Sequence, residues 1–473
     1  GEQILMKMLT CSRLSSLFVS ATRRITRRWW VLLFLAGCFS AHAQEPNQTQ
    51  KQSESGKSPV WLKTSELPAQ ATESDSAKKK PGLVNTAVNW FRRTDLPADL
   101  QIHGFASQAY ITTSDNDVFG NSDKGGSFGF TEAGLNASVR PLPRLLLSAQ
   151  VLSRRAGEGN TGMPRLDFGF LDYRIYSHEV NQFGIRVGRL KNPFGFYNET
   201  RDVAFTRPSI MLPQSIYFDR TRNLGLSSES VQLYSDAAVF GLGTFSTQFG
   251  VTLPIVSDKD TESSLLAGLQ RGQLNREVSY IGRGIFETND KRLRLGISGI
   301  WLNTSYDPNS KLNDSIGPGG LQFTPIFLSA QYNAERWTLT SEYALRHFKY
   351  DQNFGVKSPV NGLDFYGESY YFQGEYRFTP KWEGILRYDV LYTDRSDRDG
   401  SDFVKLTKGA GVAHSRFAKD ITVGLRWNVT PQFMLRAEYH HVNGTGWLST
   451  LDNVRGSTHQ HWDLFAIQGS YRF

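Results

Sequence analysis

Apolar and polar residues alternate one by one in many segments after residue 100. In the last segment, 461–473, Phe465, Ile467 and Phe473 fall on one face, and mostly polar residues fall on the other. A period of two puts successive side chains on opposite sides of an extended backbone, so this pattern predicts a β-strand. Segments such as 293–301 repeat it, with their charged residues on one face only.

Short and long connections alternate between these segments. This is typical of transmembrane barrels, in which short turns face the periplasm and long loops face outside. The segments number about 16, and an even number returns both ends of the barrel to the periplasm. The sequence therefore predicts an all-β fold, a transmembrane antiparallel β-barrel with long extracellular loops. The short connections are expected at 141–143, 177–181, 235–238, 288–290, 333–335, 379–381 and 430–432, and the long ones at 113–125, 155–165, 192–225, 254–277, 303–320, 351–362, 395–415 and 445–458.

Membrane helices are not expected beyond the leader, because no apolar run there reaches the ~20 residues that a spanning helix needs. The uncharged run from Ala237 to Ser257 comes nearest, but its Thr, Ser, Gln, Gly and Pro residues favour a strand. Backbone groups in lipid need internal partners, so membrane spanning must be by a closed barrel. A soluble β-sandwich would need a dry core, and arginines on many inward faces argue against one.

Residues 1–43 have the three parts of an export signal peptide: a basic region, an apolar core at 29–35 and an A-x-A cleavage site at Ala41-His42-Ala43. Two alternatives are open. The segment 35–38 resembles the lipobox of bacterial lipoproteins, which would place a lipid on Cys38, and 26–29 loosely resembles a twin-arginine signal. The twin-arginine route is disfavoured because barrels cross the inner membrane unfolded. We favour cleavage after Ala43.

Removal of the leader changes the charge and the cysteine content. The formal charge of +8 falls to about +3, so the basic pI gives no reason to expect nucleic acid as a partner. Both cysteines, Cys11 and Cys38, leave with the leader, which removes disulfides, thiolate metal sites and cysteine nucleophiles. Residues 44–99, rich in Gln, Ser, Lys, Glu and Pro, are expected to form a flexible periplasmic segment. The barrel is assigned to residues 100–473.

The end of the chain resembles the closing strand of bacterial outer-membrane barrels. Tyr471 and Phe473 lie on its apolar face, and the resemblance implies that the barrel-assembly machinery recognises such an end. Trp337, Trp382 and Phe433 each begin a strand after a short turn, where an aromatic girdle would meet the membrane interface. These features predict a protein of the Gram-negative outer membrane, in contact with its lipid and lipopolysaccharide.

The inward faces of the predicted strands carry arginines and carboxylates together. A barrel of about 16 strands leaves an aqueous lumen, so these charges are expected to be hydrated rather than buried. Cross-strand ion pairs that stiffen the wall are the alternative to a role in solute selection. The candidate pore-wall charges are Arg186, Arg294, Arg346, Arg387, Arg426 and Arg436, and acids on the same faces are Glu132, Glu342, Glu375, Glu383, Asp389 and Glu438.

The segment Gly188-Arg-Leu-Lys-Asn-Pro-Phe-Gly195 resembles the G-x-x-K-x-P-F-G segment of the phosphate-selective porin O and P family. The resemblance extends from residue 100 to residue 473 and implies an outer-membrane porin that forms a homotrimer. It makes this segment a junction between wall and loop, not a phosphate site. In porins the third long loop, here 192–225, commonly folds inward to narrow the pore. Phosphate-specific members line their pore with rows of Arg and Lys, and the acids of this chain depart from that pattern.

The third long loop carries the cations that are expected at the constriction. A loop inside the lumen brings charge close to a passing ion, where salt screens it less than across a wide lumen. Arg207 is the first candidate, because its sequence neighbours Thr206 and Pro208 offer it no carboxylate. The anion-binding constriction is assigned to Arg201, Arg207, Arg220, Arg222 and Lys191.

Other groups of residues give only weak evidence for a metal site or a catalytic site. His440 and His441 point to opposite faces of one strand and cannot chelate one metal ion. The segment 397–400 resembles part of a calcium loop, but Arg395 stands at its first ligand position and Leu406 at the bidentate one. His441 is a lone candidate for a hydrolase, without an assignable serine. We therefore expect no enzyme activity, no metal site and no cofactor.

Together these features predict a water-filled channel for passive diffusion of small solutes. A mild preference for anions is expected, with small anionic solutes as partners and phosphate as one candidate. The alternative is a barrel with a plugged lumen that acts as a surface adhesin or scaffold.

Overall fold

The computed structural model describes residues 100–473, apart from residues 257, 269, 313, 315, 356, 357 and 455. The signal peptide expected at 1–43, the alternative lipid site at Cys38 and the segment 44–99 lie outside the described residues. No helix in the described part combines the length and the apolar character of a membrane span.

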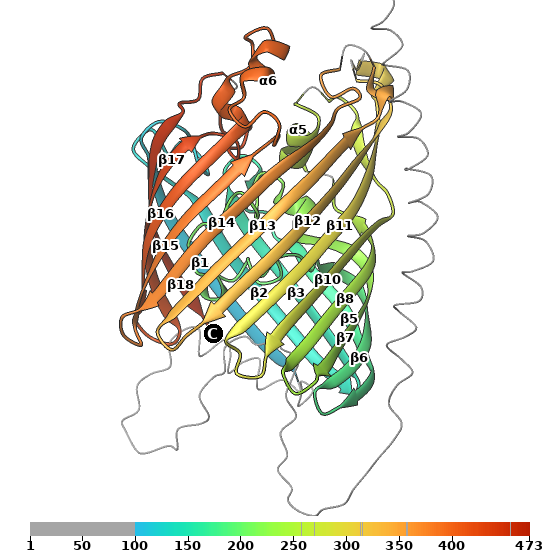
Figure 1. Cartoon of the computed structure of the whole chain (residues 1–473), viewed down its shortest axis with the longest axis vertical. Coiled ribbons are helices and arrows are strands. Elements are labelled where there is room, and N and C mark those ends of the chain that lie inside the picture. The colour runs from blue at the N-terminus through green and yellow to red at the C-terminus, as the bar shows by residue number, and fades with distance from the viewer. Residues whose placement is uncertain are drawn as a thin grey trace, which may run out of the picture. The chain divides into compact units, whose positions relative to one another are not determined.

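The described residues form one antiparallel sheet, in which sixteen long strands follow one another in chain order (Figure 1). Two short strands, β4 (Asn160–Thr161) and β9 (Gln273–Arg276), extend the sheet beside β3 and β11. The long strands are β1 (Gln101–Thr113), β2 (Ser127–Leu142), β3 (Leu145–Ala156), β5 (Arg165–His178), β6 (Asn181–Lys191), β7 (Ser227–Val239), β8 (Gly243–Pro254), β10 (Ser279–Thr288), β11 (Leu293–Asp307), β12 (Gly319–Asn333), β13 (Trp337–Tyr350), β14 (Asp364–Arg377), β15 (Trp382–Tyr392), β16 (Phe417–Asn428), β17 (Phe433–Gly444) and β18 (His461–Arg472).

The sheet closes into a barrel because β1 pairs with β18, from Phe105 opposite Arg472 to Thr113 opposite Leu464. Phe473 continues this pairing: its N–H donates to the Gly104 carbonyl at 3.0 Å, and its carbonyl accepts from the Gly104 N–H at 3.2 Å. The Phe473 ring covers Gly104 so closely that a Cβ there would lie 2.2 Å from the ring. The predicted sixteen-strand antiparallel barrel is confirmed.

The outward faces of the long strands carry mainly apolar side chains. In β18, Phe465, Ile467 and Tyr471 are exposed, whereas Gln468 and Ser470 are buried inside. The predicted assignment of alternate residues of the last strand to its outer and inner faces is therefore correct. Since lipid solvates apolar side chains and the closed sheet satisfies its own backbone, this inside-out pattern suits a membrane.

One short turn lies later than predicted. Residues 235–238 belong to β7, where Ser235 pairs with Phe183 of β6 and with Thr247 of β8. The chain reverses after Val239, where Phe240 and Gly241 both have positive φ, 47° and 72°. Hairpins favour turns with positive φ because these match the twist of the strands, and a central Gly lowers their cost. The run Ser235 to Ala238 therefore continues the strand.

Short turns gather at one end of the barrel and long loops at the other, where α5 and α6 lie (Figure 1). In α5, Asp258 caps the helix by accepting a hydrogen bond from the Thr261 N–H at 2.9 Å. The helical segments of the described loops are η2 (Ala204–Thr206), α4 (Arg222–Leu226), α5 (Lys259–Leu265), η3 (Ser310–Leu312), η4 (Gln352–Phe354), α6 (Ser401–Leu406) and η5 (Ala413–Arg416).

Candidate pore constriction

The third long connection, residues 192–226, is called the inward loop here. It leaves the wall after β6 and returns at β7, and Asn192 joins its two ends. The Asn192 N–H donates to the Leu226 carbonyl at 3.0 Å, and its side-chain amide donates to the Gly225 carbonyl at 3.1 Å. Asn198, buried beneath, donates to the carbonyls of Asn192 and Gly225, both at 2.9 Å. The loop is therefore closed at its base and projects as one unit.

Two glycines of the junction segment have conformations that other residues rarely adopt. Gly188 has φ 134°, and a Cβ there would lie 2.3 Å from the Gly169 carbonyl oxygen. Gly195 has φ 56°, and a Cβ there would lie 2.3 Å from the Tyr217 hydroxyl. Glycine suits both positions, because it adopts a positive φ readily and has no Cβ atom that would clash. The junction role expected for this segment thus has a steric basis, although Lys191 takes part in a different way, described below.

The inward loop crosses the lumen to the far wall. Glu342 of β13 accepts from the Phe196 N–H at 2.9 Å and from the Tyr217 hydroxyl at 2.6 Å. Asp389 of β15 accepts from the Ser215 N–H at 3.3 Å. Glu438 of β17 accepts from the backbone of Ile210 and Met211. Wall carboxylates thus bind loop N–H groups that no strand could satisfy, which holds the loop inside the barrel.

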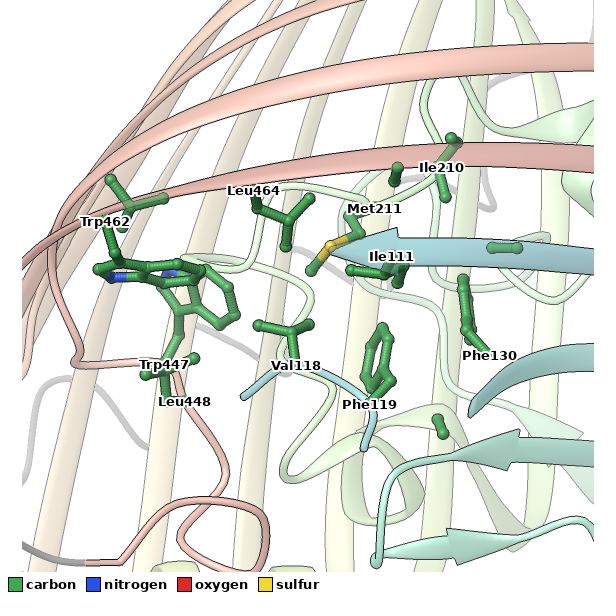
Figure 2. Packing of buried hydrophobic residues seen from close by; sticks show 14 of the residues in the cluster. Ile111, Val118, Phe119, Phe130, Ile210, Met211, Trp447, Leu448, Trp462 and Leu464 are labelled. Carbon is green, nitrogen blue, oxygen red and sulfur yellow. The ribbon is translucent and has the colours of Figure 1, made fainter. Parts of the chain in front are cut away.

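Apolar packing holds the two ends of the crossing. Near its start, the Phe194 ring stacks on Phe327 of β12 with centroids 4.9 Å apart. At its tip, Ile210 and Met211 join a buried cluster with Val118, Trp447 and other residues of the outer loops, and with side chains of β1 and β18 (Figure 2). Outer loops and inward loop therefore share one core, in which burial of each large apolar side chain stabilises the closed arrangement by about 1.5–3 kcal/mol.

An ion-pair network occupies the inward loop and the wall beside it. Glu132 of β2 accepts from Arg154 of β3 at 3.2 Å and from Arg207 at 2.6 Å. Asp219 accepts from the same Arg154 at 2.7 Å. Among the described residues, five cations share four carboxylates in this network. The cations are Arg154, Lys191, Arg201, Arg207 and Arg222, and the carboxylates are Glu132, Asp167, Asp202 and Asp219.

The residues assigned to the constriction from sequence are brought together only in part. Arg201, Arg207 and Arg222 lie in the network, and Lys191 joins it through Asp167, at 2.6 Å, and Asp202. The sequence neighbours of Arg207 offer it no carboxylate, but Glu132, far away in the sequence, supplies one, so the inference that Arg207 lacks a carboxylate partner is wrong. Burial lowers the pKa of Arg201 to about 10, which leaves it charged at neutral pH.

Four of the six candidate wall arginines are buried, three of them against the inward loop, so the expectation that they are hydrated is wrong for them. Arg387 donates to the Ser209 hydroxyl at 2.9 Å, and Arg436 donates to the Ser209 carbonyl at 3.2 Å. Arg186 pairs with Asp172 at 3.1 Å inside the wall. The reason is that the loop fills the space that sequence periodicity assigns to water. Arg186, Arg346, Arg387 and Arg436 are buried, whereas Arg294, over the Phe196 ring, and Arg426, 3.9 Å from Glu383, are partly exposed.

A pocket opens on the outer side of the network and is called the outer pocket here. Arg154 and Asp219 belong both to this pocket and to the network, so the pocket borders the network. Sequence periodicity offered no signal for it, because its residues come from loops that meet only in the folded barrel. Its lining comprises Asp117, Val118, Phe119, Arg154, Ala156, Asn160, Gln214, Asp219, Arg220, Asp260, Trp447, Leu448, Ser449 and Asp452.

Three carboxylates of the outer pocket have raised pKa values. Burial, and then the neighbouring Asp258 and Asp452, raise the pKa of Asp260 to about 6. Burial is also the main cause for Asp452 and Asp117, followed for Asp452 by the charges of Glu158 and Asp117. Burial is thus the main cause of all three shifts, and Arg154 and Arg220 line the same pocket as these aspartates.

The described residues form no group of three or more His, Cys, Asp or Glu side chains suited to a metal ion. His440 lies between Asp420, at 2.9 Å, and Glu438, at 3.4 Å, and so belongs to the anchor of the inward loop. His441 binds Asp463 at 2.8 Å on the outer surface.

Comparison with known proteins gives a likeness of fold. No family model and no curated protein matches the sequence. Among solved structures, the anion-selective porin from Comamonas acidovorans superposes with a TM-score of 0.50 at 12% identity, over 79% of this chain and 99% of that chain. The outer-membrane channel DcaP of Acinetobacter baumannii gives 0.50 at 12% identity, over 79% and 97%. OprB of Pseudomonas putida gives 0.50 at 11%, over 82% and 96%.

These likenesses establish the architecture of outer-membrane porins for this chain. Identities of this size carry no information about the solute, and they neither support nor exclude the phosphate-selective group that the junction segment resembles.

Proposed function

We propose that the protein is a porin of the Gram-negative outer membrane that lets small solutes diffuse through a constriction formed by the inward loop. The observation that carries the proposal is the inward loop itself, tied across the lumen by Glu342, Asp389 and Glu438. A segment anchored in this way sets a fixed minimum width and places charges near a passing solute. The porin fold of the chain supports the same function.

A mild preference for anions is part of the proposal. The network has one more cation than carboxylates among the described residues. A unit charge about 4 Å from an ion contributes up to roughly 4 kcal/mol at an effective dielectric of about 20. Tenfold selectivity requires only about 1.4 kcal/mol, so one incompletely balanced charge is enough. Phosphate is one candidate among the anions.

The alternative, a plugged barrel that serves as an adhesin or scaffold, is favoured by one observation. The inward loop buries Arg387, Arg436 and Glu132, which an open lumen would hydrate. A plug and a constriction differ in whether ions pass.

Conductance in planar bilayers tests the proposal. The purified protein, free of other porins, is expected to insert in discrete steps in potassium chloride and to let small sugars enter proteoliposomes in a swelling assay. Deletion of residues 199–219 should widen the channel and raise its conductance. Absence of steps in the intact protein, with steps in the deletion variant, would establish the plugged barrel instead.

The anion preference is tested by the reversal potential in a potassium chloride gradient. Arg220→Gln should shift it toward cation selectivity more than Arg294→Gln does, because Arg220 lines the outer pocket while Arg294 lies over the Phe196 ring. Added phosphate should then reduce chloride current if phosphate binds. A cation-selective wild type, or a larger effect of Arg294→Gln, would contradict an anion preference set by the loop.

Assembly as a homotrimer, insertion by the barrel-assembly machinery and contact with lipopolysaccharide complete the proposal. The exposed aromatic residues next to the short turns, Trp337, Trp382 and Phe433, suit a membrane interface. Trp382 stacks on Trp427 with ring centroids 5.1 Å apart, which joins β15 and β16 at that level.

A further inference from the structure

A groove crosses the outward face of strands β14 to β18 and is called the wall groove here. It arises where small residues face outward between large ones. Gly384 of β15 pairs with Tyr376 of β14 and with Leu425 of β16, and Leu425 in turn pairs with Ala437 of β17. Side chains that lie directly opposite each other are about 5 Å apart, so a glycine or an alanine between larger residues leaves a depression in the wall.

The outward lining of the wall groove is apolar. Aromatic and aliphatic side chains form its rims, among them Phe378, Leu386 and Phe465, which are all exposed. Phe378 lies at the end next to the short turns, where its ring packs edge-on against Tyr376 with centroids 5.2 Å apart. Such a surface suits a hydrocarbon chain and offers no partner to a polar ligand.

The length of the wall groove corresponds to one leaflet of the membrane. It begins at Phe378, beside a short turn, and ends at Tyr439 and Phe465, which pair with each other. Tyr439 lies six residues after Phe433, the first residue of β17. At about 3.3 Å per residue and a strand tilt of about 40°, the groove therefore rises about 15 Å from the short-turn end. The hydrocarbon core is about 30 Å thick, so this rise covers about half of it.

A lysine lies at the short-turn end of the wall groove. The two short turns that border the groove, 378–381 and 429–432, contain one charged residue between them, Lys381. Lys381 is exposed and forms no ion pair with a described residue, since Glu383 instead pairs with Arg377 at 3.9 Å. A cation at the membrane surface attracts the anionic headgroups of lipids.

We propose that the wall groove binds a phospholipid with an anionic headgroup, such as phosphatidylglycerol, from the periplasmic leaflet. One acyl chain lies over Ala437 between the apolar rims, and the phosphate lies against Lys381. Lipopolysaccharide does not suit the groove, because it occupies the opposite leaflet, on the side of the long loops. The inference goes beyond the channel function and does not depend on it, since the groove lies on the outside of the wall.

The test is native mass spectrometry of the detergent-solubilised protein, titrated with phosphatidylglycerol and with phosphatidylcholine of the same acyl chains. Both lipids can place a chain in the groove, but the choline group neutralises the phosphate that Lys381 would attract. Phosphatidylglycerol should therefore bind at least threefold more tightly than phosphatidylcholine.

The headgroup contact is tested by Lys381→Gln. This variant should bind phosphatidylglycerol only as tightly as phosphatidylcholine. Lys291→Gln removes an exposed lysine next to another short turn and is the matched control, which should keep the preference of the wild type.

The chain contact is tested by filling the groove. Ala437→Trp should weaken the binding of both lipids at least fivefold. Gly374→Leu is a second variant of this kind, and the atom nearest to its new Cβ would be in the Leu339 side chain at 3.6 Å, an ordinary contact. Ala330→Trp, at an exposed alanine of β12 outside the groove, is the control and should leave binding unchanged. Heat-modifiable migration on SDS gels shows that each variant has a closed barrel.

Three outcomes would overturn the proposal. Equal affinity for the two lipids, or an unchanged preference in Lys381→Gln, would remove the headgroup contact. Equal effects of Ala437→Trp and Ala330→Trp would leave the groove to bulk lipid only. If the groove-filling variants dissociate an oligomer while lipid binding persists, the groove is a contact between copies of this chain. Failure of the protein to conduct ions would refute the channel function and leave the lipid site unaffected.

Discussion

The ion pair between Arg207 and Glu132 is expected to hold the tip of the inward loop, and a double-mutant cycle measures its contribution. Their charged atoms lie 2.6 Å apart, and the two side chains are 4% and 0% exposed. The cycle uses Arg207→Gln, Glu132→Gln and the double variant. Each change keeps a polar side chain of similar length, so that the charge is the main quantity that changes.

The magnitude follows from burial and from the remaining partners. Two unit charges about 4 Å apart interact by roughly 4 kcal/mol at an effective dielectric of about 20. Each partner keeps a second contact after the other is changed, since Glu132 still binds Arg154 at 3.2 Å and Arg207 still donates to the Arg201 carbonyl at 2.9 Å. We therefore expect a coupling free energy of about 2 kcal/mol, half of the Coulomb value.

The assay is amide hydrogen exchange of the loop tip in lipid vesicles, measured by mass spectrometry on peptides that contain Ile210 and Met211. Their N–H groups bind Glu438, so they exchange only when the tip leaves the wall. The control cycle uses Asp290 and Arg292, which are 3.8 Å apart but 59% and 65% exposed, and should show no measurable coupling. Additivity of the Arg207 and Glu132 changes within about 0.5 kcal/mol would refute the anchoring role.

The remaining predictions concern assembly, the loop junction and pH. Phe473→Asp should reduce heat-modifiable, assembled protein in the outer membrane more than Arg472→Ala does, because Phe473 bonds to Gly104 and faces outward; equal losses would contradict that role. Gly188→Ala should impair folding, since its Cβ would meet a carbonyl oxygen at 2.3 Å with φ at 134°; a wild-type urea midpoint would show that the junction adapts.

The raised pKa of Asp260 makes the stability of the folded protein depend on pH, with a definite sign. Asp260 binds a proton more tightly in the folded protein, where burial raises its pKa to about 6, than in the unfolded chain, where an aspartate has a pKa of about 4. The folded state therefore gains stability as the pH falls from about 6 toward 4. Above about pH 6 the destabilisation caused by the buried, charged Asp260 is fully present. Asp260→Asn should remove this dependence in urea unfolding of the vesicle-bound protein.

Sequence periodicity determined the wall of this protein. A period of two assigns every residue of a strand to lipid or lumen, so the outward face of Phe465, Ile467 and Tyr471 followed from their spacing alone. Turn positions were less certain. The turn after Val239 depends on positive φ at Phe240, a residue that carries no turn signal of its own.

The interior was decided only by the tertiary structure. Periodicity shows that Glu132, Arg387 and Glu438 face inward, but not what they meet there. Arg207 finds its partner 75 positions away along the chain, and Met211 finds Glu438 at a separation of 227. Such contacts depend on where the inward loop crosses the barrel.

The outer pocket shows the same limit more strongly. Asp117, Asp260 and Asp452 lie in three different loops, and nothing in their local sequence relates them to one another. Closure of the barrel brings the ends of these loops together, and the shared core around Trp447 fixes them. Local alternation therefore specifies the barrel wall, because the direction of each strand side chain depends only on its sequence neighbours. The solute path depends instead on contacts between distant segments, and only closure of the barrel creates these contacts.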